Sequence, residues 1–211
     1  MERVGLFGRE GKGSPFDWLV VGLGNPGEKY RRTRHNVGED VVRLLAERRG
    51  AALTAGRDNA LIAETRFDGP DGPADERVAL AFPITYMNES GRAVGAMVRR
   101  FRIESPEQII VVQDELDLPP GDLKIKSGGG LAGHNGLRSI TQHLRTQDYL
   151  RVRIGVGKPD SKHVGKVHVL APFPKRQREL VDVAIADAAD AVEMIIAEGV
   201  DRTMMRYNGK R

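Results

Sequence analysis

Short apolar runs alternate along the chain with segments whose apolar residues recur every three or four positions. Such runs, bounded by glycine and polar residues, predict strands at 18–23, 60–67, 77–82, 109–112, 122–127 and 150–156. Helical spacing predicts helices that start near Val37, Val94, Leu137 and Leu180, and a short one at 201–207. Alternating strands and helices predict an α/β fold, here an α/β/α sandwich around a twisted mixed, mostly parallel sheet.

The chain length of 211 residues fits a single domain with a substantial core. Residues 1–16 are rich in glycine and charge, so we interpret them as a flexible tail before a domain at 17–211. The turn-forming residues of 68–76 predict a mobile loop. The sequence shows no long apolar run and no secretory leader, which predicts a cytoplasmic protein without a membrane span. The absence of cysteine excludes disulfides and thiol chemistry.

The formal net charge is only +4, from 33 basic and 29 acidic residues, but its distribution is uneven. Basic residues gather between Lys158 and Arg178 and again between Lys29 and Arg34. Patches of this kind suit a polyanion such as nucleic acid, although a solvated cationic face gives the same pattern.

The segment from Gly22 to Gly27 matches the G-x-G-x-x-G pattern of dinucleotide-binding proteins. The match is weak, because Pro26 removes a backbone donor and the next helix begins well beyond Gly27. A tight turn that presents the Asn25 amide explains the segment better. Asn25 then either binds a substrate carbonyl or simply bonds to its own backbone.

His35 comes just before a predicted helix start, where Asn36 and Glu39 have the spacing of a capping box. The positive end of a helix keeps an imidazole neutral and therefore able to accept a proton. Asp114, at the end of a buried strand, is the candidate carboxylate partner of His35. Its competitors are Glu115 and Asp117, and a purely structural role for His35 stays open.

A metal site is not expected, because no two histidines have the i, i+4 spacing or the acidic neighbours of a metal-binding motif. The other histidines are His134, His143, His163 and His168.

Two further asparagines lie beside predicted helix starts. Asn88 precedes the helix of Val94, where an N-cap role is common. Asn135 lies in the glycine-rich segment 128–136, which exposes backbone N–H groups to an anion or forms a flexible lid. Because no G-x-S-x-G elbow is present, the economical chemistry is ester hydrolysis by water that His35 activates.

Four motifs in this order resemble bacterial peptidyl-tRNA hydrolases: GLGNPGEKYRRTRHNVG, YMNESG, QDELDLPPG, and GGGLAGHNGL followed by RVRIGVG. The resemblance covers the chain from about Trp18 to Tyr207. It implies hydrolysis of the ester that joins a peptide to the 3′ end of tRNA, by a monomeric α/β/α enzyme without a cofactor. Departures include Gln113 for a common His, Tyr86 for a common Phe, and Ala132 for a common Gly.

The resemblance also implies roles for individual residues. His35 matches the catalytic base, Asp114 its supporting carboxylate, and Asn25 the residue that discriminates blocked from unblocked aminoacyl-tRNA. Lys126 and Arg153 match a basic pair associated with the 5′ phosphate of tRNA. Positions that contact tRNA or peptide, or line the same cleft, are Tyr30, Tyr86, Met87, Asn88 and Asn135. A non-catalytic RNA-binding relative is the main alternative, since a fold does not fix a function.

Overall fold

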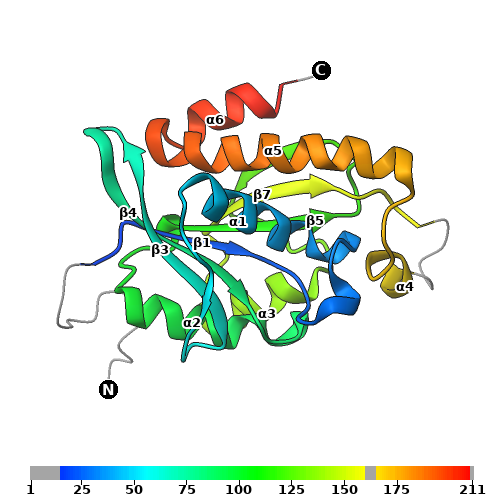
Figure 1. The fold of residues 1–211 in the computed structure, drawn as a ribbon, viewed down its shortest axis with the longest axis horizontal. Helices are drawn as coiled ribbons and strands as arrows, with labels where there is room; N and C mark the ends of the chain where they lie inside the picture. Colours follow the sequence, from blue (N-terminus) through cyan, green and yellow to red (C-terminus); the bar gives the residue numbers. More distant parts are fainter. Residues whose placement is uncertain (1–14, 160–164, 210–211) are drawn as a thin grey trace.

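The computed structural model describes residues 15–159 and 165–209, which form one three-layer α/β/α unit around a mixed sheet (Figure 1). The strands are β1 (Trp18–Gly22), β2 (Thr54–Ala55), β3 (Ala60–Gly69), β4 (Gly72–Pro83), β5 (Ile109–Glu115), β6 (Leu123–Ser127) and β7 (Leu150–Gly155). The α-helices are α1 (Val37–Arg48), α2 (Ser90–Phe101), α3 (Asn135–Leu144), α4 (Gly165–Val169), α5 (Lys175–Glu198) and α6 (Val200–Tyr207). Short 3-10 turns are η1 (Glu28–Tyr30), η2 (Arg34–Asn36), η3 (Met87–Glu89) and η4 (Pro106–Gln108).

The strand order is β2-β3-β4-β1-β5-β7-β6. The four central strands, β4, β1, β5 and β7, run parallel, whereas β2, β3 and β6 pair in antiparallel fashion at the two edges. Helices α1, α5 and α6 cover one face of the sheet, and α2 and α3 cover the other (Figure 1). The predicted α/β/α sandwich is therefore confirmed, with the parallel pairs in its centre.

No helix in the described part of the chain combines the length and the apolar character that crossing a bilayer requires. The longest, α5, instead carries polar residues along its outer side while its alanine-rich stripe packs on the sheet.

Two expected boundaries were wrong. Phe16, assigned to the tail, is buried against Phe101, with ring centroids 4.6 Å apart and its backbone N–H donating to the Phe101 carbonyl. The tail predicted for residues 1–14 lies outside the described residues. The expected loop at 68–76 is mostly strand, because the pairing of β3 with β4 continues to a tight turn between Gly69 and Gly72.

The glycines that resemble a dinucleotide fingerprint allow helix α1 to approach strand β1 closely. A Cβ atom on Gly22 would overlap the carbonyl of Gly38, and one on Gly24 would lie 2.9 Å from the amide of Asn36. After Gly27 the chain forms the single turn η1, and α1 begins only at Val37. A dinucleotide fingerprint needs the helix to open directly after the glycines, so this interpretation has no structural support.

Candidate active site

The order of the parallel strands brings three distant sequence segments to one edge of the sheet. Strands β4, β1 and β5 are neighbours and run in the same direction, so their carboxyl ends lie side by side. The segments after β1 and β4 and the last residues of β5 line a pocket of about 710 Å³, together with the segments around His134 and Lys166. Ligands of α/β proteins commonly bind at this edge.

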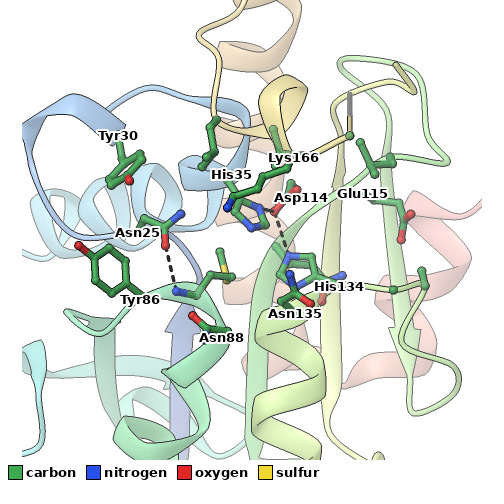
Figure 2. A pocket seen from close by; sticks show the side chains of 18 residues that line it. Asn25, Tyr30, His35, Tyr86, Asn88, Asp114, Glu115, His134, Asn135 and Lys166 are labelled. Carbon is green, nitrogen blue, oxygen red and sulfur yellow. Dashed lines mark hydrogen bonds and ion pairs between the residues drawn. The ribbon is translucent and has the colours of Figure 1, made fainter. Parts of the chain in front are cut away.

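Eight of the ten residues that the sequence predicted for the site line this pocket (Figure 2). They are Asn25, Tyr30, His35, Tyr86, Met87, Asn88, Asp114 and Asn135. Lys126 and Arg153 lie outside it.

His35 and Asp114 form a buried hydrogen-bonded pair. The Nδ1 atom of His35 is 2.8 Å from Oδ1 of Asp114, with side-chain exposures of 11% and 2%. The competing carboxylates are engaged elsewhere: Glu115 binds Arg153 at 2.6 Å, and Asp117 binds Lys158 at 2.7 Å. The predicted partner of His35 is therefore confirmed as a neighbour in space.

A second histidine, to which the sequence assigned no role, shares the same carboxylate oxygen. Nε2 of His134 lies 3.0 Å from Oδ1 of Asp114. The other ring nitrogen, Nδ1, accepts hydrogen bonds from the backbone N–H groups of Gly136 and Leu137, so that His134 is the N-cap of α3. Since Nδ1 is an acceptor, the proton of the neutral ring lies on Nε2 and is donated to Asp114.

The protonation of His35 follows from the same contact. Ionised Asp114 accepts hydrogen bonds only, so Nδ1 of His35 carries a proton and Nε2 is left as the basic nitrogen of the ring. Two ring N–H groups thus converge on one carboxylate. In Figure 2, His35 lies beside the pocket, with His134 on the other side of Asp114.

The charges of this cluster shift both titrating groups. Burial lowers the pKa of His35, but the charge and hydrogen bond of Asp114 outweigh burial, so the pKa is raised above its usual value. Burial raises the pKa of Asp114, yet the two histidines hold it well below the usual range of a carboxyl group. Asp114 therefore stays ionised and favours the imidazolium that His35 forms when it accepts a proton.

The structure contradicts the expectation that no pair of histidines has an acidic neighbour, because His35 and His134 both contact Asp114. The ligand atoms of His35, Asp114 and His134 lie within 4.8 Å of one another. However, a metal ligand must offer a lone pair, and the nitrogen of His134 that faces Asp114 carries the proton. The residues fit a hydrogen-bond network better than a metal site.

A hydrogen bond from another segment fixes the orientation of the Asn25 side-chain amide. Its Oδ1 accepts the backbone N–H of Met87 at 2.9 Å. Figure 2 shows Asn25 at the pocket, with the hydrogen bond to Met87 dashed. Among the described residues, no acceptor binds the Nδ2 group of Asn25. The chain bends at Pro26 and Gly27, and the Asn25 amide is positioned by another segment rather than by its own backbone.

Asn88 and Asn135 border the pocket close to the ends of α2 and α3 (Figure 2). The possible N-cap role of Asn88 was wrong, because Asn88 lies in η3 and α2 begins after Glu89. Asn135 is the first residue of α3, and the cap itself is His134. Both side chains are exposed, so their amides can reach a bound molecule.

The predicted capping box at α1 was also wrong. Asn36 precedes the helix, but its side chain makes no cap hydrogen bond. It binds the backbone of Asn25 instead, and Glu39 binds the Asn36 side chain rather than its backbone.

Lys126 and Arg153 lie on the adjacent strands β6 and β7. The ammonium group of Lys126 lies against Gly129, and no carboxylate pairs with it among residues 15–159 and 165–209. Arg153, by contrast, donates from Nε and Nη2 to Oε2 of Glu115 at 2.9 and 2.6 Å. Lys126 is therefore the freer cation of the two.

Some members of the two basic clusters pair with neighbouring carboxylates. Arg178 binds Asp40 and Asp182, Arg31 binds Glu28, and Arg32 binds Asp182. The buried guanidinium of Arg34 donates to carbonyls at the end of α4 and in the segment after it. Lys162 and His163 lie outside the described residues. Lys29, Lys166, Lys175 and Arg176 are exposed and form no ion pair within the described part of the chain, so both clusters still offer cationic surface.

Helix α4 was not predicted, although Gly165, Lys166 and Val169 line one side of the pocket. The helix has only five residues and lies in a polar stretch, so its apolar spacing is too short to be recognised. Its position depends on the long-range contacts of Arg34 with the carbonyls of His168, Ala171 and Pro172.

Comparisons with known proteins agree with this geometry. The family model described as peptidyl-tRNA hydrolase matches residues 19–211. The peptidyl-tRNA hydrolase of Cutibacterium acnes is 49% identical over 196 residues, which is 90% of this chain and 98% of that protein. The corresponding protein of Frankia alni is 47% identical over 191 residues, covering 90% and 93%.

Among solved structures, the crystal structure of peptidyl-tRNA hydrolase from Acinetobacter baumannii superposes with a TM-score of 0.84. It is 37% identical in sequence, and the match covers 94% of this chain and 99% of that one. Sequence and fold agree over nearly the whole described chain, and the protein therefore belongs to the peptidyl-tRNA hydrolase family.

Proposed function

We propose that this protein hydrolyses the ester bond between a peptide, or an N-blocked aminoacyl group, and the 3′ end of tRNA. The observation that carries the proposal is the His35–Asp114 pair beside a pocket lined by asparagine amides. Membership of the family, together with the match to its solved structure, supports the substrate class.

In the proposed reaction, Nε2 of His35 takes a proton from a water molecule, whose oxygen attacks the ester carbonyl carbon. The carbonyl π-electrons move onto oxygen and form a tetrahedral intermediate. When this collapses, the bond to the ribose oxygen breaks, and the imidazolium of His35 returns the proton to that oxygen. The products are a peptide acid and tRNA with a free terminal hydroxyl. Asp114 stabilises the imidazolium between the two proton transfers.

The orientation of the Asn25 amide supplies a reason for preferring blocked substrates. Because Oδ1 of Asn25 is turned to the backbone N–H of Met87, its Nδ2 group is the part left for a substrate, and it offers N–H groups to a carbonyl. A peptide or N-acyl group provides such a carbonyl next to the ester-bearing residue. A free α-amino group is a cation with donors only, so it leaves Asn25 without an acceptor.

The remaining predicted contacts divide between cleft and surface. We assign Tyr30, Tyr86, Met87, Asn88 and Asn135 to the peptide and the terminal nucleotides of tRNA, because they border the same pocket as His35. We assign Lys126, with Arg153, to a tRNA phosphate outside the pocket. We also propose that the protein acts as a monomer in the cytoplasm and needs no cofactor, since water and His35 suffice for the chemistry.

The proposal is tested with N-acetyl-aminoacyl-tRNA and the matching unblocked aminoacyl-tRNA in ¹⁸O-labelled water. We expect rapid release of tRNA only from the blocked substrate, with one labelled oxygen in the released carboxylate. Binding of both tRNAs without hydrolysis would contradict the proposal and favour a non-catalytic RNA-binding protein. Label in the tRNA hydroxyl would contradict attack at the carbonyl carbon.

A further inference from the structure

A chain of buried polar contacts connects the surface of α1 to the residue that we assign to substrate discrimination. Arg43 donates from Nε to Oε1 of Glu39 at 2.8 Å, and Oε2 of Glu39 accepts from Nδ2 of Asn36 at 2.7 Å. Asn36 in turn binds Asn25, and Asn25 binds Met87. The Glu39 side chain is 5% exposed and that of Arg43 is 44% exposed, so the chain runs from solvent to the pocket.

The side-chain amide of Asn36 forms hydrogen bonds with both the backbone N–H and the backbone carbonyl of Asn25. Its Oδ1 accepts the backbone N–H of Asn25 at 3.0 Å, and its Nδ2 donates to the Asn25 carbonyl at 2.9 Å. Nδ2 also donates to Glu39, so both N–H groups of the Asn36 amide have partners in a fully buried position. Gly24 leaves room for this contact, because a side chain there would collide with the Asn36 amide.

From these contacts we infer that Glu39, held by Arg43, is a positioning residue for Asn25. An ionised carboxylate only accepts hydrogen bonds, so it forces the Nδ2 side of the Asn36 amide towards itself. The Oδ1 side then faces the Asn25 N–H, which is the only orientation in which both Asn25 bonds form. The residue pair that resembles a capping box therefore orients an amide instead: the backbone N–H of Asn36 binds the Thr33 carbonyl and is unavailable to Glu39.

The expected consequence is specific to recognition of the acyl group. His35 is held by Asp114, which lies on β5. Within the described residues, the hydrogen bonds of Glu39 reach neither His35 nor Asp114. Disturbing Glu39 therefore moves Asn25 relative to the substrate carbonyl while leaving the basicity of His35 unchanged. This inference rests on the proposed function, because it assigns Glu39 to the discrimination step of that reaction.

The test is Glu39→Gln, with Glu47→Gln as the matched control on the exposed side of the same helix. In Glu39→Gln, Arg43 attracts the oxygen of the introduced amide, which turns the amide nitrogen towards Nδ2 of Asn36 and sets donor against donor. We expect KM for N-acetyl-aminoacyl-tRNA to rise about 5- to 20-fold and the preference over unblocked substrate to fall similarly. The midpoint of the pH–rate profile should not move.

A readout that does not depend on activity is hydrogen exchange of the Asn25 backbone N–H, followed by NMR. It should accelerate in Glu39→Gln and stay unchanged in Glu47→Gln. If Glu39→Gln does not fold, Arg43→Met provides the same test, because Arg43 is the exposed residue in this series of hydrogen bonds. We expect KM and Asn25 exchange to change in the same direction as in Glu39→Gln, but by less.

Unchanged KM and unchanged Asn25 exchange in a folded variant would overturn the inference, as would a shifted pH midpoint, which would place the effect on His35. If the wild-type protein hydrolyses neither substrate, the proposed function fails instead, and Asn25 exchange still decides whether Glu39 positions Asn25.

Discussion

His35 and Asp114 lie 79 positions apart in the chain and meet through a 2.8 Å hydrogen bond. The contact forms because η2 follows the β1 turn and Asp114 lies at the end of β5, the parallel neighbour of β1. It fixes the ring so that Nδ1 is the donor and Nε2 is the base. The central claim is that this nitrogen activates the attacking water.

Replacing Asp114 by Asn removes the charge but nearly preserves the shape. We expect kcat/KM for N-blocked aminoacyl-tRNA to fall by about 10²- to 10⁴-fold, because the imidazolium loses its counter-charge. Asp114 raises the pKa of His35, and a general base works when deprotonated, so activity rises as pH passes upward through that pKa. Without the charge, the midpoint should move to lower pH. A midpoint that stays or rises would count against the pairing.

His134 has two roles that one substitution can separate. In His134→Asn the short side chain still caps α3, but it does not reach Asp114. We expect thermal stability close to that of the wild type and a loss of activity of about tenfold. His134→Phe loses the cap as well, which should cost about 1 kcal/mol of unfolding free energy. Denaturant titration and initial rates measure the two effects, and equal destabilisation of both variants would refute the separation.

Ala132 adopts the left-handed conformation, with φ of 48°, in the loop that leads to His134. For a residue with a Cβ atom this conformation costs about 1–2 kcal/mol of folding free energy. Glycine removes this strain, but its greater freedom in the unfolded chain offsets part of the gain. We expect Ala132→Gly to raise the unfolding free energy by up to about 1 kcal/mol. Chemical denaturation provides the measurement, and a clear loss of stability would mean that the Ala132 methyl group makes a compensating contact.

Salt dependence of tRNA binding distinguishes Lys126 from Arg153. A lost phosphate contact reduces the slope of log K against log salt by a little under one. We expect nearly this full change for Lys126→Ala and a smaller one for Arg153→Ala, because Glu115 already balances Arg153. Arg48→Ala, in the outer helix layer where Arg48 pairs with Asp190, is the control and should leave the slope unchanged. Equal slopes for all three variants would remove Lys126 from the phosphate site.

The sequence allowed the contact between His35 and Asp114 and most of the pocket lining to be predicted, because several of these residues follow apolar runs that are recognisable as strands. His35 was placed just before a helix start and Asp114 at the end of a buried strand, and the family motifs joined the two. Roles that depend on tertiary contacts were harder to predict from the sequence. Asn36 has the local pattern of an N-cap, yet the Asn25 backbone competes for its side chain and prevails.

The remaining errors have the same origin. His134 was an unassigned histidine because nothing in the GHNG segment indicates that its ring both caps a helix and donates to a residue 20 positions earlier. Phe16 is a lone aromatic after a charged, glycine-rich segment, so only its contact with Phe101 places it in the core. At 68–76 the turn signal was correct, but backbone pairing extends the strands beyond their apolar residues.

The most direct test of the central claim is the turnover of N-acetyl-aminoacyl-tRNA by His35→Ala, measured together with tRNA affinity and thermal stability. We predict a loss of at least about 10²-fold in kcat, with tRNA binding and folding largely retained. Near-normal turnover in the folded variant would contradict the assignment of His35 as the base.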